Sequence, residues 1–263
     1  FIQVRMASKR LPGKALCDIN GLTAIERVVN NIKPSKYINK VVIVTARGRD
    51  NDPIIDVAKR KGIDYFRGDE INVVERYIGA AKKFNTDIVV RITGDCPLIS
   101  FEITDYLIEH HLKSGVDYTG IEVNSAPIGT FSEVINFPAL QKLAGLNVDL
   151  SYGEYMSFYF RNNPEYFSIN ILPGLKKFYR PDYRLTLDYP QDLEVIRELY
   201  ECIGKKFAAI PLKQAIAYLD KHPDICMKNK DVKIKWKDDK EVLNKIIKYT
   251  KIKGCLNEKN SSD

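Results

Sequence analysis

The sequence predicts an α/β protein whose central, mostly parallel sheet is flanked by helices. Apolar, β-rich runs at residues 40–46, 63–67 and 87–93 alternate with helical patterns at 23–32, 53–61 and 73–84. Such alternation is typical of parallel strands joined by right-handed crossovers. With 263 residues, of which 44% are hydrophobic, the chain is long enough to bury a full core.

The first predicted strand is short and runs into a loop with the composition of a polyphosphate-binding site. Arg5, Arg10 and Lys14 supply positive charge and Ser8 supplies a hydroxyl group. Backbone N–H groups around Gly13 could complete an anion nest. On composition alone, a solvated basic loop is an equally good interpretation.

A second chemically rich loop follows the strand at 87–93. Asp95 stands just after this strand, where a carboxylate is well placed to hold Mg²⁺ against phosphate oxygens. A turn or helix cap is the alternative role for this residue. Ligands of parallel sheets bind beyond the carboxyl ends of the strands, so we expect Asp95 and the basic loop to face one crevice.

A third strand end is expected at residues 184–188, directly before a helix that starts near Pro190. Asp188 is either a second metal ligand or the cap of that helix, and spacing alone favours the cap. The chain contains neither G-x-G-x-x-G nor G-x-x-x-x-G-K-[ST]. A dinucleotide-binding loop and a P-loop are therefore not supported.

The net charge of +7 is concentrated in the tail, because residues 228–253 contain ten lysines against four acidic residues. A basic tail could bind nucleic acid or an anionic surface, but the chain has no recognised nucleic-acid module and we expect no such partner. The tail pattern predicts a helix that starts at a capping box formed by Asp238 and Glu241 and ends at Gly254. Its apolar positions are Val242, Leu243, Ile246 and Ile247. We expect this helix to dock on the body or on a second subunit.

Cysteine usage and hydropathy indicate the class of protein. The five cysteines are scattered and lack the paired spacing of zinc sites or disulfide frameworks, so we expect reduced thiols. No apolar run approaches the roughly 18 residues that span a bilayer, and no signal-peptide pattern opens the chain. A soluble, cytoplasmic protein without a membrane partner is expected.

Four segments, in this order, resemble the cytidylyltransferase family. They are residues 3–14 (QVRMASKRLPGK), the run from 66–68 (FRG) to 73–77 (VVERY), 91–98 (RITGDCPL) and 187–193 (LDYPQDL). The most similar branch is named for spore-coat polysaccharide biosynthesis protein F and is related to CMP-sialate and CMP-Kdo synthetases. The resemblance covers about residues 1–222. It implies a Rossmann-like nucleotide-diphospho-sugar transferase fold and transfer of CMP from CTP to an acceptor oxygen, with release of pyrophosphate.

The resemblance also assigns roles to individual residues on the nucleotide side. It implies that Arg5, Arg10, Lys14 and Asp95 are catalytic and that Asp95 and Asp188 bind Mg²⁺. The nucleotide-binding set that it implies is Gln3, Arg5, Ser8, Arg10, Lys14, Arg76, Thr93 and Gly94. For Arg76 an ion pair at the surface with Glu75 or Asp69 is the alternative.

The acceptor side departs from the family pattern. Phe131 stands where the family has an acid, although Glu133 is retained; Glu154 matches the family, but Tyr155 replaces a histidine. These four residues are the predicted acceptor-binding set. The two replacements change the hydrogen bonding available to an acceptor. We therefore expect an acceptor other than a typical nine-carbon sugar acid, such as a phosphonate, a phosphorylated compound or a modified sugar.

The predicted organisation is a nucleotidyltransferase domain at 1–222 and a basic C-terminal extension with one helix at 223–263. Homodimerisation is expected from the family. No histidine is needed for the chemistry, and His110, His111 and His222 are expected on helices away from the loops. Two alternatives stay open: a sugar-1-phosphate nucleotidyltransferase that uses another nucleotide, and a non-catalytic nucleotide-binding relative.

Overall fold

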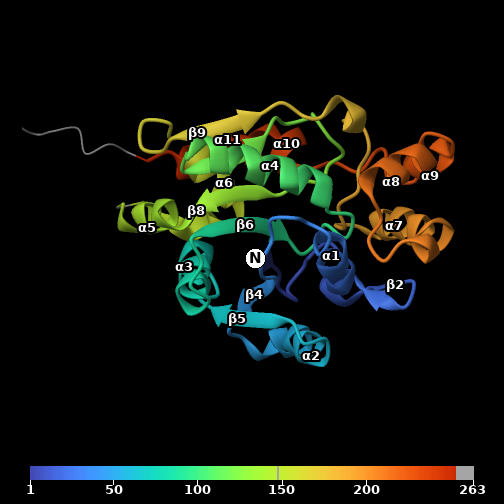
Figure 1. Cartoon of the computed structure of the whole chain (residues 1–263), viewed down its shortest axis with the longest axis horizontal. Coiled ribbons are helices and arrows are strands. Elements are labelled where there is room, and N and C mark those ends of the chain that lie inside the picture. The colour runs from blue at the N-terminus through green and yellow to red at the C-terminus, as the bar shows by residue number, and fades with distance from the viewer. Residues whose placement is uncertain (147, 253–263) are drawn as a thin grey trace, which may run out of the picture.

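A seven-stranded sheet in the order β5-β4-β1-β6-β8-β7-β9 forms the centre of the protein (Figure 1). The computed structural model describes residues 1–146 and 148–252. The strands are β1 (Ile2–Gln3), β4 (Val42–Ala46), β5 (Asp64–Gly68), β6 (Ile88–Thr93), β7 (Tyr118–Ile121), β8 (Glu133–Asn136) and β9 (Ile169–Leu172). Strand β8 runs antiparallel to both its neighbours, while the other pairings in this sheet are parallel. The prediction of a mostly parallel sheet is confirmed.

Helices occupy the predicted connections between the first strands. The three predicted helices are α1 (Ala24–Ile32), α2 (Asp52–Arg60) and α3 (Val73–Lys83). The remaining helices are α4 (Phe101–Ser114), α5 (Phe137–Gly145), α6 (Met156–Arg161), α7 (Pro190–Cys202), α8 (Leu212–Leu219), α9 (Pro223–Met227), α10 (Lys235–Asp238) and α11 (Lys240–Thr250). Short 3₁₀ helices include η1 (Lys14–Leu16) and η3 (Leu150–Tyr155), and a small hairpin joins β2 (Asp18–Ile19) to β3 (Leu22–Thr23).

Alternation along the strands divides the core between two faces of the sheet. Val42 and Val44 of β4 pack with α3, α5 and α6, whereas Ile43 between them packs with α1 and α2. This period of two follows from the strand geometry, in which successive side chains point to opposite faces. The result is a three-layered arrangement with the sheet in the middle.

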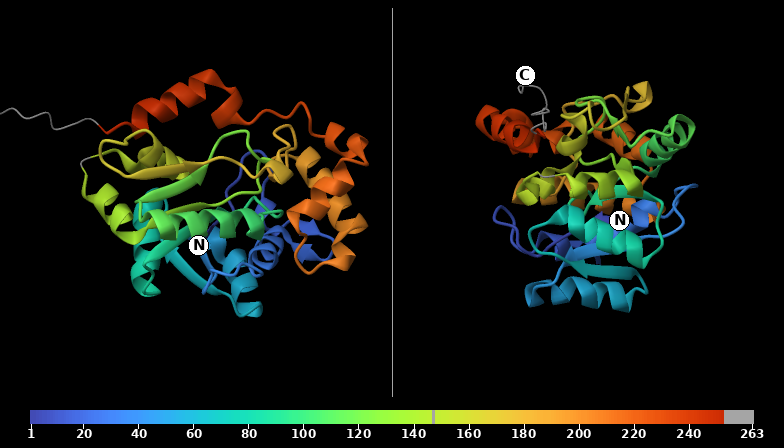
Figure 2. Two further views of the ribbon diagram at one scale, coloured as in Figure 1. Left: turned by 45° about the horizontal axis from the view of Figure 1, so that its top comes forward. Right: turned by 90° about the vertical axis from the view of Figure 1, so that its left-hand side faces the viewer.

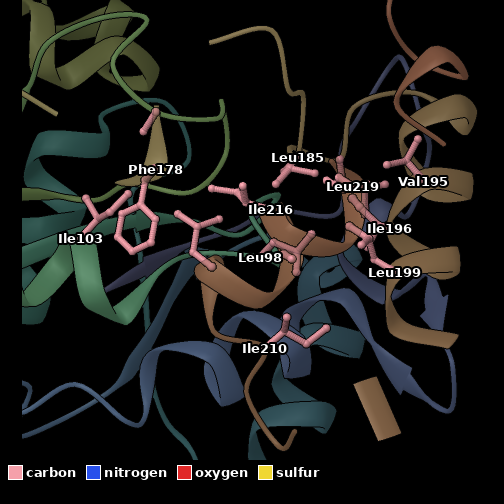
Figure 3. Packing of buried hydrophobic residues seen from close by; sticks show 14 of the residues in the cluster. Leu98, Ile103, Phe178, Leu185, Val195, Ile196, Leu199, Ile210, Ile216 and Leu219 are labelled. Carbon is pink, nitrogen blue, oxygen red and sulfur yellow. The ribbon is translucent and has the colours of Figure 1, made fainter. Parts of the chain in front are cut away.

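A third cluster packs α4, α7 and α8 together and supports two loops that carry predicted site residues (Figure 3). Leu98 follows the loop of Asp95, and Leu185 precedes Asp188; both side chains are almost fully buried in this cluster. Buried apolar side chains fix their backbone because leaving the core would expose them to water. The cluster therefore holds both loops in place.

The predicted strand at residues 184–188 is wrong. Arg184 makes a single parallel bridge to Ile128. The residues after Arg184 then bond first to the loop of Ile128 and next to the loop of Asp95. The Leu185 N–H donates to the Ile128 carbonyl at 2.8 Å, and the Leu187 N–H donates to the Asp95 carbonyl at 2.7 Å. Since these partners lie on separate loops, no continuous ladder forms. The helix predicted to follow is confirmed as α7.

The C-terminal extension folds back onto the body, as Figure 2 shows for the segment that runs from α9 to α11. The Thr250 hydroxyl and carbonyl accept from the side-chain amides of Asn162 and Asn163 at 2.7 and 2.8 Å, and Lys251 pairs with Glu165 at 2.7 Å. Docking of the tail on the body is confirmed.

The details of the tail helix differ from the prediction. Asp239, and not Asp238, caps α11 by accepting from the N–H groups of Glu241 and Val242. The Asp238 carboxylate instead accepts from the N–H of Ile234, within the turn of α10. Of the four predicted apolar positions, Ile246 is buried but Ile247 is 42% exposed, because the helix packs on the body along a narrow stripe. Gly254 lies outside the described residues.

The cysteines and histidines of the described residues can be compared with their expected states. Cys17, Cys96, Cys202 and Cys226 are free thiols, and Cys255 lies outside the described residues. On α4, His111 is buried against Thr119 and Asn136, whereas His222 lies in a turn before α9 and not on a helix as predicted. Within 1–146 and 148–252, no helix is long and apolar enough to cross a membrane.

Candidate active site

Lys14 lies between two carboxylates at the carboxyl-terminal edge of the sheet. Its Nζ donates to Asp95 Oδ2 at 2.7 Å and to Asp188 Oδ1 at 2.8 Å. Arg10 donates to the same Asp188 oxygen at 2.6 Å. The structure thus brings together four predicted site residues from three segments that are far apart in the sequence.

Two glycines shape the loops that carry these side chains. Gly13 has a φ of 68°, a left-handed conformation that glycine adopts freely, and it turns the chain into η1, where Lys14 stands. Gly94 donates to the Gln3 carbonyl at 2.8 Å, and a Cβ at this position would lie 2.7 Å from Val4. The loop of Asp95 can therefore pass directly against the end of β1.

The charges of the cluster stabilise one another. Burial alone would lower the pKa of Lys14, but the charges and hydrogen bonds of Asp95 and Asp188 outweigh it, so this pKa is raised. For Asp95 burial would raise the pKa, but the charge and hydrogen bond of Lys14, together with hydrogen bonds from within its own loop, outweigh burial and lower it. Both shifts favour the charged forms of Lys14 and Asp95.

Asp188 is not the cap of α7, contrary to what its spacing favours. Tyr189 holds the N-cap position, and Asp192 Oδ2 accepts from the N–H groups of both Asp188 and Tyr189 at 2.9 Å. The Asp188 carboxylate is therefore free to accept from Lys14 and Arg10. Its second oxygen, Oδ2, accepts from Arg184 at 3.3 Å.

Three buried residues beneath Asp188 were not predicted as part of the site. Arg184 binds both oxygens of Asp192 at 2.7 and 2.9 Å, and Asn229 donates to Asp192 Oδ1 at 3.0 Å. Asp192 is fully buried, so this network is shielded from solvent. No local pattern pointed to these three residues, because a four-residue spacing brings side chains together only within a helix and residues 184–189 precede α7.

Arg5 and Ser8 are separate from the Lys14 cluster. Arg5 donates to the Glu154 carboxylate at 2.9 Å, and both side chains are more than half exposed. The Ser8 hydroxyl accepts from the N–H of Leu11 at 3.3 Å and so shapes the basic loop. Arg5 therefore lies next to a predicted acceptor-side residue, at the exposed rim of the site.

Glu133 is part of a buried ion pair. Its Oε2 accepts from Arg91 at 2.5 Å, and its Oε1 accepts from the Tyr118 hydroxyl at 2.7 Å. Arg91 also donates to Gln3 Oε1 at 3.3 Å and to the Glu154 carbonyl at 3.0 Å. Both oxygens of Glu133 are thus engaged within the protein.

The remaining predicted residues lie around the cluster. Arg76 is only 2% exposed and donates to the carbonyls of Asp69 and Glu70 at 2.7 and 2.8 Å, so the predicted alternative of a surface ion pair is wrong. Phe131 packs against the cluster shown in Figure 3. The Thr93 hydroxyl contacts the Cys96 thiol at 3.1 Å and stays within the Asp95 loop. Tyr155 ends η3, beside Glu154.

Comparison with known proteins gives consistent matches. A family model described as Cytidylyltransferase matches residues 1–225. Spore coat polysaccharide biosynthesis protein SpsF of Bacillus subtilis is 30% identical over 229 residues, which are 85% of this chain and 94% of that protein. A cytidylyltransferase structure from Leptospira borgpetersenii superposes with a TM-score of 0.79 at 29% identity, covering 89% of this chain and 96% of the other.

A more distant structure shares the fold. CMP:2-keto-3-deoxy-manno-octonic acid synthetase, solved in complex with CTP, has a TM-score of 0.59 at 16% identity and covers 78% of this chain and 98% of its own. The expected nucleotide-sugar transferase fold is confirmed by these neighbours.

Proposed function

Because the chain belongs to the cytidylyltransferase family, we propose that it transfers CMP from CTP to an acceptor oxygen and releases pyrophosphate in a Mg²⁺-dependent reaction. The observation that carries this proposal is the meeting of Arg10, Lys14, Asp95 and Asp188 at one edge of the sheet. As a family member the chain is a nucleotidyltransferase, and the four residues supply what such a reaction requires.

The basic residues act on the triphosphate. Arg10 and Lys14 now neutralise carboxylates, and phosphate oxygens of CTP compete for the same donors. In an in-line displacement at the α-phosphorus, these cations offset the charge that grows on the departing pyrophosphate. The reaction depends on positioning and on charge neutralisation more than on a strong base. This agrees with a cluster in which no histidine takes part.

The carboxylates fit a magnesium ion. Asp95 and Asp188 both contact the Lys14 ammonium, so the pair already accommodates a cation between them. Mg²⁺ prefers oxygen ligands and is commonly held by one or two carboxylates together with substrate phosphates and water. Bound there, it would polarise the phosphate oxygens and make the α-phosphorus more electrophilic. Arg184 and Asp192 keep Asp188 in position for this role.

The acceptor is proposed to be a sugar acid, a phosphonate or a related small molecule. The family has two acidic residues at this place. Here Phe131 replaces the first and packs on the core, and Glu133 is engaged by Arg91 and Tyr118, so no free carboxylate is left to bind the acceptor. Arg5 remains accessible on the rim and suits an anionic acceptor. The name of the Bacillus relative suggests a product used in polysaccharide biosynthesis. A homodimer in the cytoplasm stays a prediction.

The test is acceptor-dependent release of pyrophosphate. Each of the four ribonucleoside triphosphates is supplied with Mg²⁺ and a panel of 3-deoxy-manno-octulosonate, glucose 1-phosphate and 2-aminoethylphosphonate. We expect release with CTP, and we expect Asp95→Asn to abolish it. Asp64→Asn is a matched control, because Asp64 also pairs with a lysine, at 3.3 Å, but on the surface. Release with another nucleotide in preference to CTP, or full activity of Asp95→Asn, would contradict the proposal.

A further inference from the structure

The C-terminal extension sends an aromatic side chain toward the acceptor side of the site. Trp236 of α10 packs edge-on against Phe158 of α6, with ring centroids 6.3 Å apart and planes at 70°. Phe158 in turn packs edge-on against Tyr155, at 6.5 Å and 81°. Three aromatic rings thus form a continuous row from the extension to a predicted acceptor-binding residue.

The end of this row at Tyr155 is held through the contacts of its neighbour, Glu154. The carbonyl of Glu154 accepts from the buried Arg91, and its carboxylate holds Arg5. Tyr155 is therefore fixed through its neighbour to the rim on which Arg5 lies. Burial and the charge of Glu154 raise the pKa of the Tyr155 phenol, and the charge of Arg10 opposes them.

The extension end of the row is fixed as well. Helix α11 follows α10 directly and is held through Thr250 to Asn162 and Asn163. Tyr249 of α11 also stacks on Tyr152, with centroids 4.7 Å apart. These contacts hold α11 against the body, and α10 packs on α11. Trp236 itself lies beyond residue 225, where the match to the family model ends.

We infer that Trp236 is a positioning residue of the acceptor site, which acts through Phe158 to hold the ring of Tyr155 as an aromatic wall. Aromatic rings offer a large apolar surface with a polar handle, and sugar rings present apolar C–H faces that pack on such surfaces. The wall selects an acceptor that combines an apolar ring face with an anionic group, the latter bound by Arg5. This inference rests on the proposed function, because it places the acceptor beside Tyr155.

Trp236 provides a probe for its own role, because it is the single tryptophan of the chain. Its emission is recorded while 3-deoxy-manno-octulosonate, glucose 1-phosphate or 2-aminoethylphosphonate is titrated into the full-length protein with CTP and Mg²⁺. We expect the ring-bearing acceptor to change the emission, and we expect the ringless phosphonate to leave it unchanged. The same emission in the presence and absence of every compound would overturn the inference.

Two variants separate the role of Trp236 from general docking of the tail. Trp236→Ala should raise the KM for the acceptor about three- to tenfold, since one aromatic pair contributes on the order of that factor, and should leave the KM for CTP within about twofold. Tyr249→Ala is the matched control, because it removes another tail ring that stacks on the body but lies outside the row. Trp236→Phe should restore most of the acceptor affinity.

The outcomes distinguish this inference from the proposed function. If Trp236→Ala and Tyr249→Ala raise the acceptor KM equally, or if neither does, Trp236 has no specific role, whereas transfer from CTP still stands. If no compound releases pyrophosphate but a ring-bearing compound changes the emission of Trp236, the binding inference is supported and the proposed reaction is not.

Discussion

Replacing Glu133 by glutamine tests whether this residue supports the fold or binds the acceptor. The substitution preserves the shape of the side chain and a partner for the Tyr118 hydroxyl, but it removes the negative charge opposite Arg91. Arg91 is buried, and the carboxylate raises the pKa of its guanidinium despite that burial. Since arginine does not lose its proton in proteins, the variant contains a buried cation without a counter-ion.

The expected loss of stability is large. Removal of one partner from a buried ion pair costs about 3–5 kcal/mol, because the remaining charge stays desolvated. Gln3 and the Glu154 carbonyl still accept from Arg91, which favours the lower end of this range. For a chain of this size, such a loss corresponds to a decrease in Tm on the order of 10 °C.

The dependence on pH provides a second signature. Burial would raise the pKa of Glu133, but the charges of Arg91 and Arg161, together with the hydrogen bonds from Tyr118 and Arg91, outweigh burial and hold this pKa below the ordinary value of 4.5. A carboxyl group with a depressed folded-state pKa stabilises the fold fully above its unfolded-state pKa. That contribution is lost as the pH falls through the folded-state value. The wild-type protein should therefore lose this part of its stability in acid below about pH 4.5, and Glu133→Gln should lack this component.

Urea unfolding followed by circular dichroism at several pH values measures both effects. Glu109→Gln is the control, because Glu109 forms an exposed pair with Lys113 on α4 and its loss should change the unfolding midpoint little. Steady-state kinetics with the acceptor are measured on the same variants. If Glu133→Gln is as stable as the wild type and only the acceptor KM rises, the reasoning is refuted and Glu133 binds the acceptor.

Three further predictions concern the cluster around Lys14. Asp95→Asn should abolish turnover while the thermal midpoint shows an intact fold; residual turnover above about one hundredth of the wild type would remove Asp95 from the catalytic set. Arg10→Ala and Lys14→Ala should weaken CTP binding in calorimetry by at least about tenfold and cytidine binding much less, since each removes a charged phosphate contact; equal losses for both ligands would contradict the assignment. Asn229→Ala should raise the Mg²⁺ concentration for half-maximal activity a few-fold and weaken Mn²⁺ binding to the CTP-bound protein in calorimetry, because Asp192 loses a donor and holds Asp188 less firmly; unchanged metal binding would show that Asn229 supports only the fold.

Local patterns were sufficient to predict the first half of the fold. The alternation of apolar residues along 42–46 and the helical period of 73–83 follow from periodicities that the backbone imposes. The nearness of Lys14 to Asp95 followed from a general property of parallel sheets, whose loops meet at the carboxyl ends of the strands. The place of Asp188 in the same site was predicted only from the family resemblance, because its spacing in the sequence favoured a helix cap.

The remaining features depend on contacts that no local pattern encodes. Residues 184–188 were predicted to form a strand because apolar and polar side chains alternate along them. Their hydrogen-bond partners, Ile128 and Asp95, lie on two different loops. Glu133 is predicted to bind the acceptor, and this stays a prediction. Its place opposite Arg91 depends on the register of β6 against β8, which no local pattern encodes. The return of Asn229 to Asp192 spans 37 residues. Such long-range pairings are set by tertiary packing.

The balance of charge around Lys14 has a consequence for the order in which substrates bind. Two carboxylates and two cations, joined by contacts of 2.6–2.8 Å, make the free site nearly neutral. A neutral site exerts little long-range attraction on a free dication, whose capture relies on a negative field. In the proposed reaction, CTP carries its own negative charge and would draw Lys14 and Arg10 onto its phosphates, which would expose the carboxylates to a metal ion. We therefore predict ordered addition, in which the nucleotide binds before the metal ion or together with it, as a consequence of the internal ion pairs of the free site.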